Sequence, residues 1–350
     1  MKTRRVVAAL AALALTAVTA ACGGGESAGG GGSTGAVKEV RLGYFPNITH
    51  STALVGVEKG LFSKHLGSGV SLKTSTFNAG PAAIEAVFSG AIDATYIGPN
   101  PAINAWAKSK GQAIKIIAGS ASGGVSLIVK PEITSVEGLK GKKIATPQLG
   151  NTQDVALRYW LQEKGLKTDV KGGGDVHIVP QENSQTLQTF ATGDIDGAWV
   201  PEPFASRLIL ESKGKTLVDE RDLWPNRQFV ITHLIVRQEW AKANPDLVKK
   251  LLEAHVESTK YITDDPAAAA KTVNTAIEKL TQKPLKPEVL DSAFKNITFT
   301  NDPIASSLVG SADHAIKVGL LDPVDLNGIY DLKTLNEVLA AQGQQSISDK

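Results

Sequence analysis

The stretch that decides the fold is SGAIDATYI at residues 89–97, because TGDIDGAWV repeats its pattern 103 residues later, at 192–200. Each copy follows an apolar helical pattern and runs into a proline-rich loop. A glycine that closes a helix, followed by a short apolar run, predicts a helix, a turn and a buried strand in each copy. Asp93 and Asp196 occupy the same turn of the two copies, and we expect both to bond local backbone.

A second repeated motif lies upstream of the first. EKGL stands at 58–61 and again at 163–166, each time at the end of a helical stretch, where glycine commonly supplies the left-handed cap. A short strand and a polar loop precede each of these helices, with the strands at 40–44 and 143–146. Strands that alternate with helices in both halves predict an α/β fold with parallel sheets.

The two halves are expected to form two lobes joined by two crossover segments. The first crossing falls near residues 128–131, where an extended segment runs into a proline, and the second is the apolar run at 229–236. From residue 238 the apolar spacing is helical, and we expect this part to return to the first lobe. Lobe 1 is therefore predicted as residues 37–129 plus 237–350, and lobe 2 as residues 130–236.

The N-terminus has the order of a secretory signal peptide, predicted as residues 1–21. Basic residues come first, an uncharged apolar run follows at 6–18, and small residues end the segment, as in such signals. Cys22 comes next and is the only cysteine of the chain. A lone cysteine in an exported protein has no internal disulfide partner, so we infer neither a redox nor a metal role for it.

Small residues directly before a cysteine resemble the lipobox of bacterial lipoproteins, although Thr19 stands where leucine is usual. The resemblance implies that Cys22 is lipidated and becomes the mature N-terminus. Residues 22–36 are rich in glycine, which is typical of a flexible tether. We therefore predict an exported protein that is anchored to the outer face of the cell membrane through lipidated Cys22.

Charge argues against a nucleic-acid partner. The chain has 37 basic and 35 acidic residues, but Lys2, Arg4 and Arg5 belong to the predicted signal peptide. The mature chain then carries 34 basic residues against 35 acidic ones, with no basic patch of the kind that binds nucleic acid.

Polar loops at the ends of the predicted strands form the expected ligand site. In parallel α/β sheets, ligands bind beyond the carboxyl ends of the strands. The first turn of the helix that follows offers free N–H groups and a positive dipole end, which suit phosphate, sulfonate, nitrate or carboxylate. Amides and hydroxyls are expected to hold a small anion here, and the predicted ligand-binding residues are Tyr44, Phe45, Asn47, Thr49, His50, Asn78, Gly98, Asn100, Ser122, Gly123, Asn151, Thr152, Gln153, Trp199 and Glu202.

Six of these residues also have a structural interpretation. Tyr44 and Phe45 stand at a strand end, where they either wall the cleft or pack beneath it. Asn78 and Asn151 stand where helix caps are expected, and Trp199 lies in a predicted buried strand. Glu202 lies between two prolines, where its carboxylate either binds an ammonium group of the ligand or latches the lobes through a hydrogen bond.

Signatures of catalysis are missing from the sequence. It contains no His-Glu-x-x-His motif, no Walker phosphate loop and no Gly-x-Ser-x-Gly elbow. None of the six histidines is spaced like a metal-ligating pair. We therefore predict no enzyme activity, no metal and no cofactor.

Several motifs together resemble the aliphatic sulfonate, taurine and nitrate group of ABC-transporter solute-binding proteins, which also has relatives linked to thiamine-precursor uptake. The motifs are GYFP at 43–46, KGLF at 59–62, SGAIDA at 89–94, GPNPA at 98–102, LKGKKIA at 139–145 and WVPEP at 199–203.

The resemblance implies a type II periplasmic-binding-protein fold, a ligand cleft between two lobes, and an ABC permease and ATPase as partners. An aliphatic sulfonate is the first expected ligand, with taurine, nitrate or a thiamine precursor as alternatives. A ligand-sensing surface protein without transport stays open as a different use of the same fold.

Overall fold

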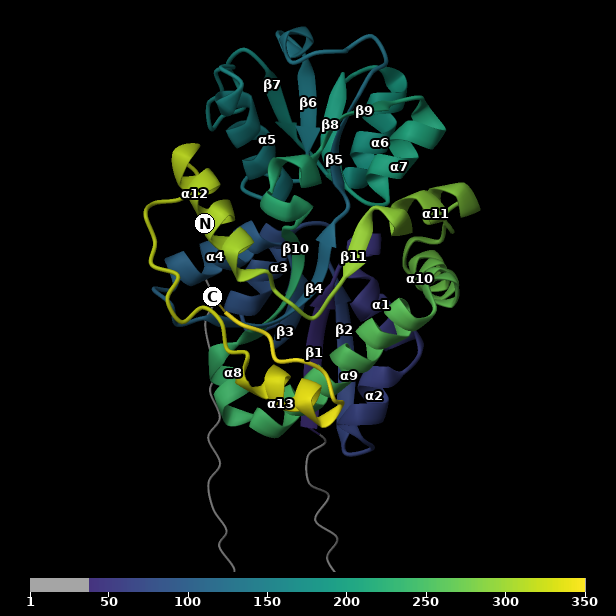
Figure 1. Ribbon diagram of the computed structural model, residues 1–350, viewed down its shortest axis with the longest axis vertical. Helices are drawn as coiled ribbons and strands as arrows, with labels where there is room; N and C mark the ends of the chain where they lie inside the picture. The colour runs from purple at the N-terminus through teal and green to yellow at the C-terminus, as the bar shows by residue number, and fades with distance from the viewer. Residues whose placement is uncertain (1–37, 350) are drawn as a thin grey trace, which may run out of the picture. The chain divides into compact units, whose positions relative to one another are not determined.

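Two β-sheets organise the computed structural model, which describes residues 38–349 (Figure 1). The predicted signal peptide, Cys22 and the tether lie outside these residues. The six-stranded sheet has the order β11-β4-β10-β3-β1-β2 and the five-stranded sheet the order β7-β6-β8-β5-β9. The first sheet consists of β1 (Lys38–Tyr44), β2 (Val70–Thr76), β3 (Ala94–Ile97), β4 (Ile114–Gly123), β10 (Val230–Arg237) and β11 (Ile297–Phe299). The second consists of β5 (Val125–Val129), β6 (Lys143–Thr146), β7 (His177–Pro180), β8 (Gly197–Pro201) and β9 (Lys215–Asp219).

Helices surround both sheets, so the fold belongs to the α/β class that the sequence predicts. In the part of the chain before β10 they are α1 (Ser51–Glu58), α2 (Leu61–Leu66), α3 (Gly80–Phe88), α4 (Pro99–Lys108), α5 (Thr152–Glu163), α6 (Asn183–Thr192) and α7 (Phe204–Ser212). After β10 they are α8 (Gln238–Ala243), α9 (Pro245–Asp264), α10 (Pro266–Thr281), α11 (Pro287–Lys295), α12 (Ala305–Lys317) and α13 (Lys333–Ala341). Single 3-10 turns are η1 (Ile48–His50), η2 (Glu137–Leu139), η3 (Glu220–Leu223) and η4 (Pro225–Arg227). None of the helices within residues 38–349 has the length and apolar character that a membrane crossing requires.

The predicted internal repeat is a structural repeat. β1 pairs in parallel with β2 and β3, and β6 pairs in parallel with β7 and β8 in the same way. The two EKGL motifs end their helices at Gly60 and Gly165, whose φ angles of 67° and 76° lie in the left-handed region that glycine tolerates. Other strands run antiparallel, because β10 and β5 enter their sheets from the opposite lobe.

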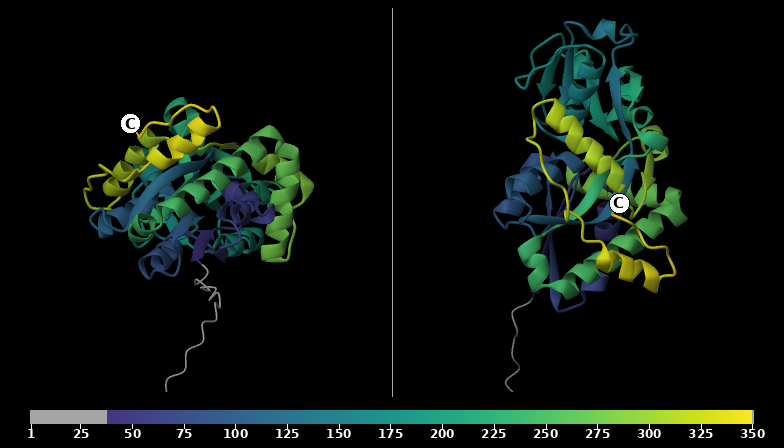
Figure 2. Two further views of the ribbon diagram at one scale, coloured as in Figure 1. Left: turned by 90° about the horizontal axis from the view of Figure 1, so that it is seen from below. Right: turned by 60° about the vertical axis from the view of Figure 1, so that its left-hand side comes forward.

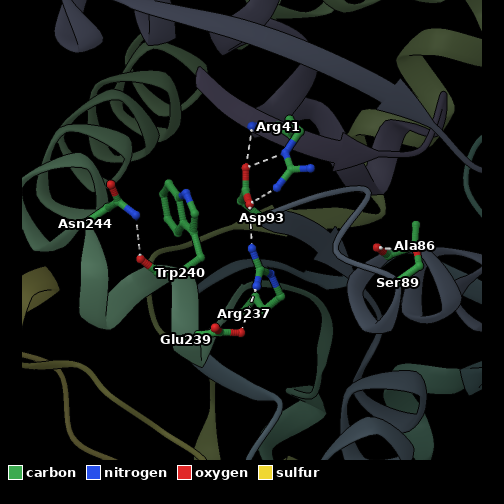
Figure 3. A network of polar contacts seen from close by, with 8 residues as sticks. All are labelled: Arg41, Ala86, Ser89, Asp93, Arg237, Glu239, Trp240 and Asn244. Atoms are coloured by element: carbon green, nitrogen blue, oxygen red, sulfur yellow. Dashed lines mark hydrogen bonds and ion pairs between the residues drawn. The ribbon is translucent and has the colours of Figure 1, made fainter. Parts of the chain in front are cut away.

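Both repeated aspartates accept a backbone N–H from the strand beside them, 52 and 53 residues away in the chain, and not from the local backbone as the sequence predicts. Asp93 Oδ2 accepts the backbone N–H of Arg41 at 3.0 Å, and Asp196 Oδ2 accepts the backbone N–H of Lys143 at 2.9 Å. Asp93 is buried and also pairs with the guanidinium groups of Arg41 and Arg237, which come from β1 and the end of β10 (Figure 3). This ion-pair cluster ties the strands together at the end of the sheet opposite the loops that follow β1 and β3.

The chain changes sheet one strand earlier than each predicted lobe boundary. Gly123 and Gly124, with φ angles of 77° and 70°, form the first crossing, so β5 belongs to the second sheet. The return lies between β9 and β10, so the apolar strand β10 belongs to the first sheet. We call the part built on the first sheet the first lobe and the part built on the second sheet the second lobe.

The C-terminal part contributes mainly to the first lobe. β11 joins the first sheet, and α9 packs against α1 and α2. Leu247, Leu251, Leu252, His255 and Thr259 all lie on the buried face of α9 that the sequence predicts. α12 packs against α4 and also against α5 of the second lobe, so it bridges the lobes along one side (Figure 2).

Candidate functional site

A small cavity lies where the loops of the two lobes meet. Its volume is about 20 Å³, which suffices for about one water molecule. The lining comes from the loops after β1 and β3, from the last residue of β8, from the N-cap and first residues of α5, from the first residue of α6, and from β10. The lining residues are Phe45, Asn47, Thr49, His50, Gly98, Asn151, Thr152, Gln153, Asn183, Pro201 and Ile231.

The first-lobe wall is polar but carries no charge. The Nδ1 atom of His50 accepts the backbone N–H of Phe45 at 3.3 Å, and the two rings stack with centroids 4.3 Å apart. Burial lowers the pKa of His50 to about 3, so the imidazole is neutral at physiological pH. Because Nδ1 is an acceptor here, the neutral ring carries its proton on Nε2 and presents it as a donor.

Two buried polar atoms of the second-lobe wall have no hydrogen-bond partner. They are Thr152 Oγ1 and Asn183 Oδ1, which belong to residues only 5% exposed. Each residue is the first of its helix, α5 or α6, where backbone N–H groups also lack intrahelical acceptors. Burying an unpaired polar group is costly, so this arrangement indicates a site that is completed by a ligand or by water.

Asn151 stands at the N-cap position of α5 without acting as a side-chain cap. Its side chain makes no capping hydrogen bond, and Nδ2 instead donates to Gln153 Oε1 at 3.0 Å. This contact orients both amides at the cavity wall. Asn78 is not the cap of α3 either, because Ala79 takes that position.

Eight of the fifteen predicted ligand-binding residues meet at the cavity: Phe45, Asn47, Thr49, His50, Gly98, Asn151, Thr152 and Gln153. A larger groove of about 610 Å³ shares Asn47 and Asn183 with the cavity and also takes in Asn78. The groove runs along α6 and α7 of the second lobe and the end of α10. It offers room beside the cavity for the organic part of a ligand.

The structure places five other predicted residues away from the cavity. Tyr44 lies in the hydrophobic core at the end of β1, and Asn100 Nδ2 donates to the backbone oxygen of Ser311 at 2.9 Å. Ser122 and Gly123 are held within the first sheet by pairing with β11. Trp199 is fully buried, which agrees with its structural interpretation, and its Nε1 donates to Glu220 Oε2 at 2.6 Å.

Glu202, the last predicted residue, contacts the other lobe. Its carboxylate accepts Asn296 Nδ2 at 2.8 Å and the backbone N–H of Ser206 at 3.0 Å. Asn296 directly precedes β11 of the first sheet, so the first of these bonds joins the lobes as the latch interpretation predicts. Burial raises the pKa of Glu202, although the hydrogen bonds from Asn296 and Ser206 oppose that shift. The carboxylate is not part of the cavity lining.

Sequence reasoning missed Asn183, Pro201 and Ile231. The repeat itself contains the signal for Asn183, because the EKGL offset of 105 residues carries Asn78 onto Asn183. Pro201 likewise corresponds to Gly98 at the offset of 103 residues. Ile231 gives no signal, since it is one apolar residue in the apolar strand β10.

Within residues 38–349, no group of three or more His, Cys, Asp or Glu side chains is arranged to hold a metal ion. The cavity lining contains no charged side chain of either sign. Neutral polar groups and helix N-termini are therefore what the lining offers to a ligand.

Two α/β lobes that close over a polar cavity at their strand ends define the periplasmic-binding-protein class of folds. The model of the NMT1-like family matches residues 33–277, and the chain belongs to this family. A Brucella abortus protein named as a binding protein is 29% identical over 301 residues, covering 83% of this chain and 89% of its own length. A Bacillus subtilis protein named as an aliphatic sulfonates-binding protein is 24% identical over 87% of this chain and 89% of its own length.

Solved structures show the same fold. The alkanesulfonate-binding protein SsuA from Xanthomonas axonopodis, bound to MOPS, superposes with a TM-score of 0.67 at 19% identity. The superposition covers 81% of this chain and 94% of SsuA. Further relatives of this chain are named for binding taurine and nitrate or nitrite. These relatives are thus named as binding proteins for small solutes.

Proposed function

We propose that the protein is the extracytoplasmic substrate-binding lipoprotein of an ABC importer, that it binds a small anion, and that it delivers this anion to a permease driven by an ATPase. The observation that carries the proposal is the unpartnered hydroxyl oxygen of Thr152 at the N-terminus of α5, a helix end that faces one cavity together with the N-terminus of α6. The relatives named above support the transport role, and the predicted lipid anchor at Cys22 would keep the protein near its permease. We propose no enzyme activity for it.

The lining favours an anion of low charge. A cation would require a carboxylate or several convergent carbonyl groups, whereas the cavity lining contains no charged side chain. Helix N-termini, the threonine hydroxyl and the Nε2 proton of His50 all favour negative charge. A multiply charged anion would require arginine or lysine, which this lining lacks.

Among small anions, an aliphatic sulfonate is our first choice. The groove beside the cavity has room for an organic tail next to a bound head group, whereas nitrate has no such tail. Taurine comes second, because the Glu202 carboxylate is already engaged by Asn296, and an ammonium group would rely on Glu182 of the groove instead. Nitrate and thiamine precursors follow.

A thermal-shift screen of the purified protein tests the proposal. The panel consists of methanesulfonate and longer alkanesulfonates, taurine, nitrate, sulfate, thiamine precursors and amino acids. A ligand present at one hundred times its dissociation constant stabilises the fold by about 2.7 kcal/mol, which a melting curve resolves. A shift with a sulfonate supports the proposal, and a shift confined to cationic or aromatic compounds overturns the anion assignment. Loss of sulfonate uptake on deletion of the gene tests the transport role.

A further inference from the structure

A fully buried ion pair lies directly behind the cavity wall. Asp154 and Arg158 are one turn apart in α5, with side chains only 0% and 1% exposed, and Arg158 Nε lies 2.9 Å from Asp154 Oδ2. Arg158 is the only buried lysine or arginine among residues 38–349. Burying two charges is expensive, so a buried pair is weak support for stability and calls for another explanation.

The Asp154 carboxylate holds the loop that carries the cavity residues of α5. Its Oδ2 accepts the backbone N–H of Gly150 at 2.9 Å, and its Oδ1 accepts the hydroxyl of Thr146 at 2.8 Å. Gly150 has a φ of 74° and immediately precedes Asn151, the first of three consecutive cavity residues. The carboxylate thereby fixes the entry to α5 against the end of β6.

The guanidinium group of Arg158 holds that carboxylate from the other side. Arg158 Nε and Nη2 donate to the two oxygens of Asp154 at 2.9 and 3.1 Å, and Nη1 donates to the backbone oxygen of Asp169. Both carboxylate oxygens therefore accept two hydrogen bonds each, and neither is left to compete for donors at the cavity. The pair is a closed unit beneath the site.

Charge gives this unit a second consequence. A carboxylate in the first turn of α5 opposes an anion at the same helix end, and buried charges are poorly screened by solvent. Arg158 cancels that charge where it is bound, so the N-terminus of α5 keeps the positive end of its dipole for the ligand. A site whose lining has no cation thus depends on one buried cation behind the lining.

We propose that Arg158 is a positioning residue of the anion site and acts through Asp154. It fixes the loop of Asn151, Thr152 and Gln153 and neutralises the one carboxylate at that helix end. The charge part of this inference rests on the proposed function, whereas the positioning part does not.

Three variants separate a charge role from a merely structural one: Arg158→Met, Asp154→Asn and the two together. Calorimetric titration with methanesulfonate measures each affinity. Arg158→Met leaves an unpaired carboxylate beneath the anion, so affinity falls by about tenfold or more. Asp154→Asn leaves the guanidinium alone, so affinity stays within about threefold of the wild type or rises, and the double variant recovers to within about threefold.

Opposite signs for the two single variants support the charge role. If the ion pair only stabilises the structure, both single variants weaken binding alike, in proportion to the stability that they lose. That result overturns the charge role. If Arg158→Met does not fold, Asp154→Asn decides alone on the charge role: a loss of tenfold or more there contradicts it.

Hydrogen exchange measured on the unliganded protein tests the positioning role independently of anion binding. The Gly150 amide of Asp154→Asn should exchange at least about tenfold faster than in the wild type, with the amides of β5 unchanged as the control. An unchanged Gly150 amide overturns the positioning role. If the wild type binds no anion at all, the proposed function and the charge role fail together, while the exchange result still stands.

Discussion

Gly98 is the point at which a single added methyl group should prevent productive closure on a ligand. Gly98 is the N-cap of α4, with φ −72° and ψ 162°, a backbone conformation that alanine adopts without strain. A Cβ atom at this position would lie 2.5 Å from Thr152 Oγ1 of the opposite lobe. The variant Gly98→Ala therefore perturbs the contact between the lobes and leaves the local backbone of each lobe intact.

The expected loss follows from what must move. Ordinary contacts of this kind begin at 3.4 Å, so either the lobes part by about 0.9 Å here or Thr152 rotates its hydroxyl away. Both responses take Thr152 Oγ1 out of its place at the cavity. A hydrogen bond to a charged group contributes about 1.5–3 kcal/mol, which corresponds to a loss of affinity of about 10- to 100-fold.

Calorimetry with methanesulfonate measures the loss, and thermal unfolding without ligand shows whether the fold is unchanged. The matched control is Gly98→Ala in a Thr152→Ala background, where the obstructing oxygen is gone. There the alanine should cost little further affinity, so the double-mutant cycle shows strong coupling. Wild-type affinity in Gly98→Ala, or an equal loss in both backgrounds, would refute the closure argument.

Three further variants test other parts of the structure. Asn183→Ala should weaken methanesulfonate binding by about tenfold with little change in melting temperature, because Asn183 lines the cavity and its amide NH2 group can donate to the anion; an equal effect of Ser184→Ala would contradict this. Glu202→Gln keeps the shape of the latch but weakens the bond to Asn296, so affinity should fall by about three- to tenfold, and unchanged affinity in titration calorimetry would remove the latch. Glu220→Gln should stabilise the protein by about 3 kcal/mol at pH 8, as measured by denaturant unfolding, because burial raises the pKa of Glu220 to about 7. The wild type loses this stability as the pH rises from about 4.5 through 7, so the two proteins should converge at pH 4, and a constant difference across the range would contradict the assignment.

The repeat made most of the fold predictable from the sequence. Two copies of one pattern specify the same strand and helix order twice, and both aspartates make the same contact with the neighbouring strand, although the sequence predicts local backbone as their partner. The crossings were harder to place. Gly123 is among the predicted ligand-binding residues, whereas the positive φ angles of Gly123 and Gly124 serve the change of sheet.

The sequence predicts the part of the candidate site that lies in the loops after strands, and it does not predict the rest. Polar residues that directly follow a parallel strand lie at the carboxyl end of the sheet. Most of those that follow β1 and β6 line the cavity. For the other predicted residues, the direction of the side chain decides whether it reaches the cavity. Trp199 lies in a strand buried on both faces, where alternation carries no information, and Asn100 turns toward α12, whose position the local sequence does not specify.

The central claim is that neutral groups of the interlobe cavity bind a small anion, and titration calorimetry of Thr152→Val with methanesulfonate tests it most directly. Valine keeps the shape of Thr152 and removes its unpartnered hydroxyl, while Thr152→Ser keeps the hydroxyl and serves as the control. The account predicts one site per chain in the wild type, affinity within about threefold in Thr152→Ser, and a loss of about tenfold or more in Thr152→Val. Equal affinity for the anion in all three proteins would show that it binds elsewhere, and would contradict the account.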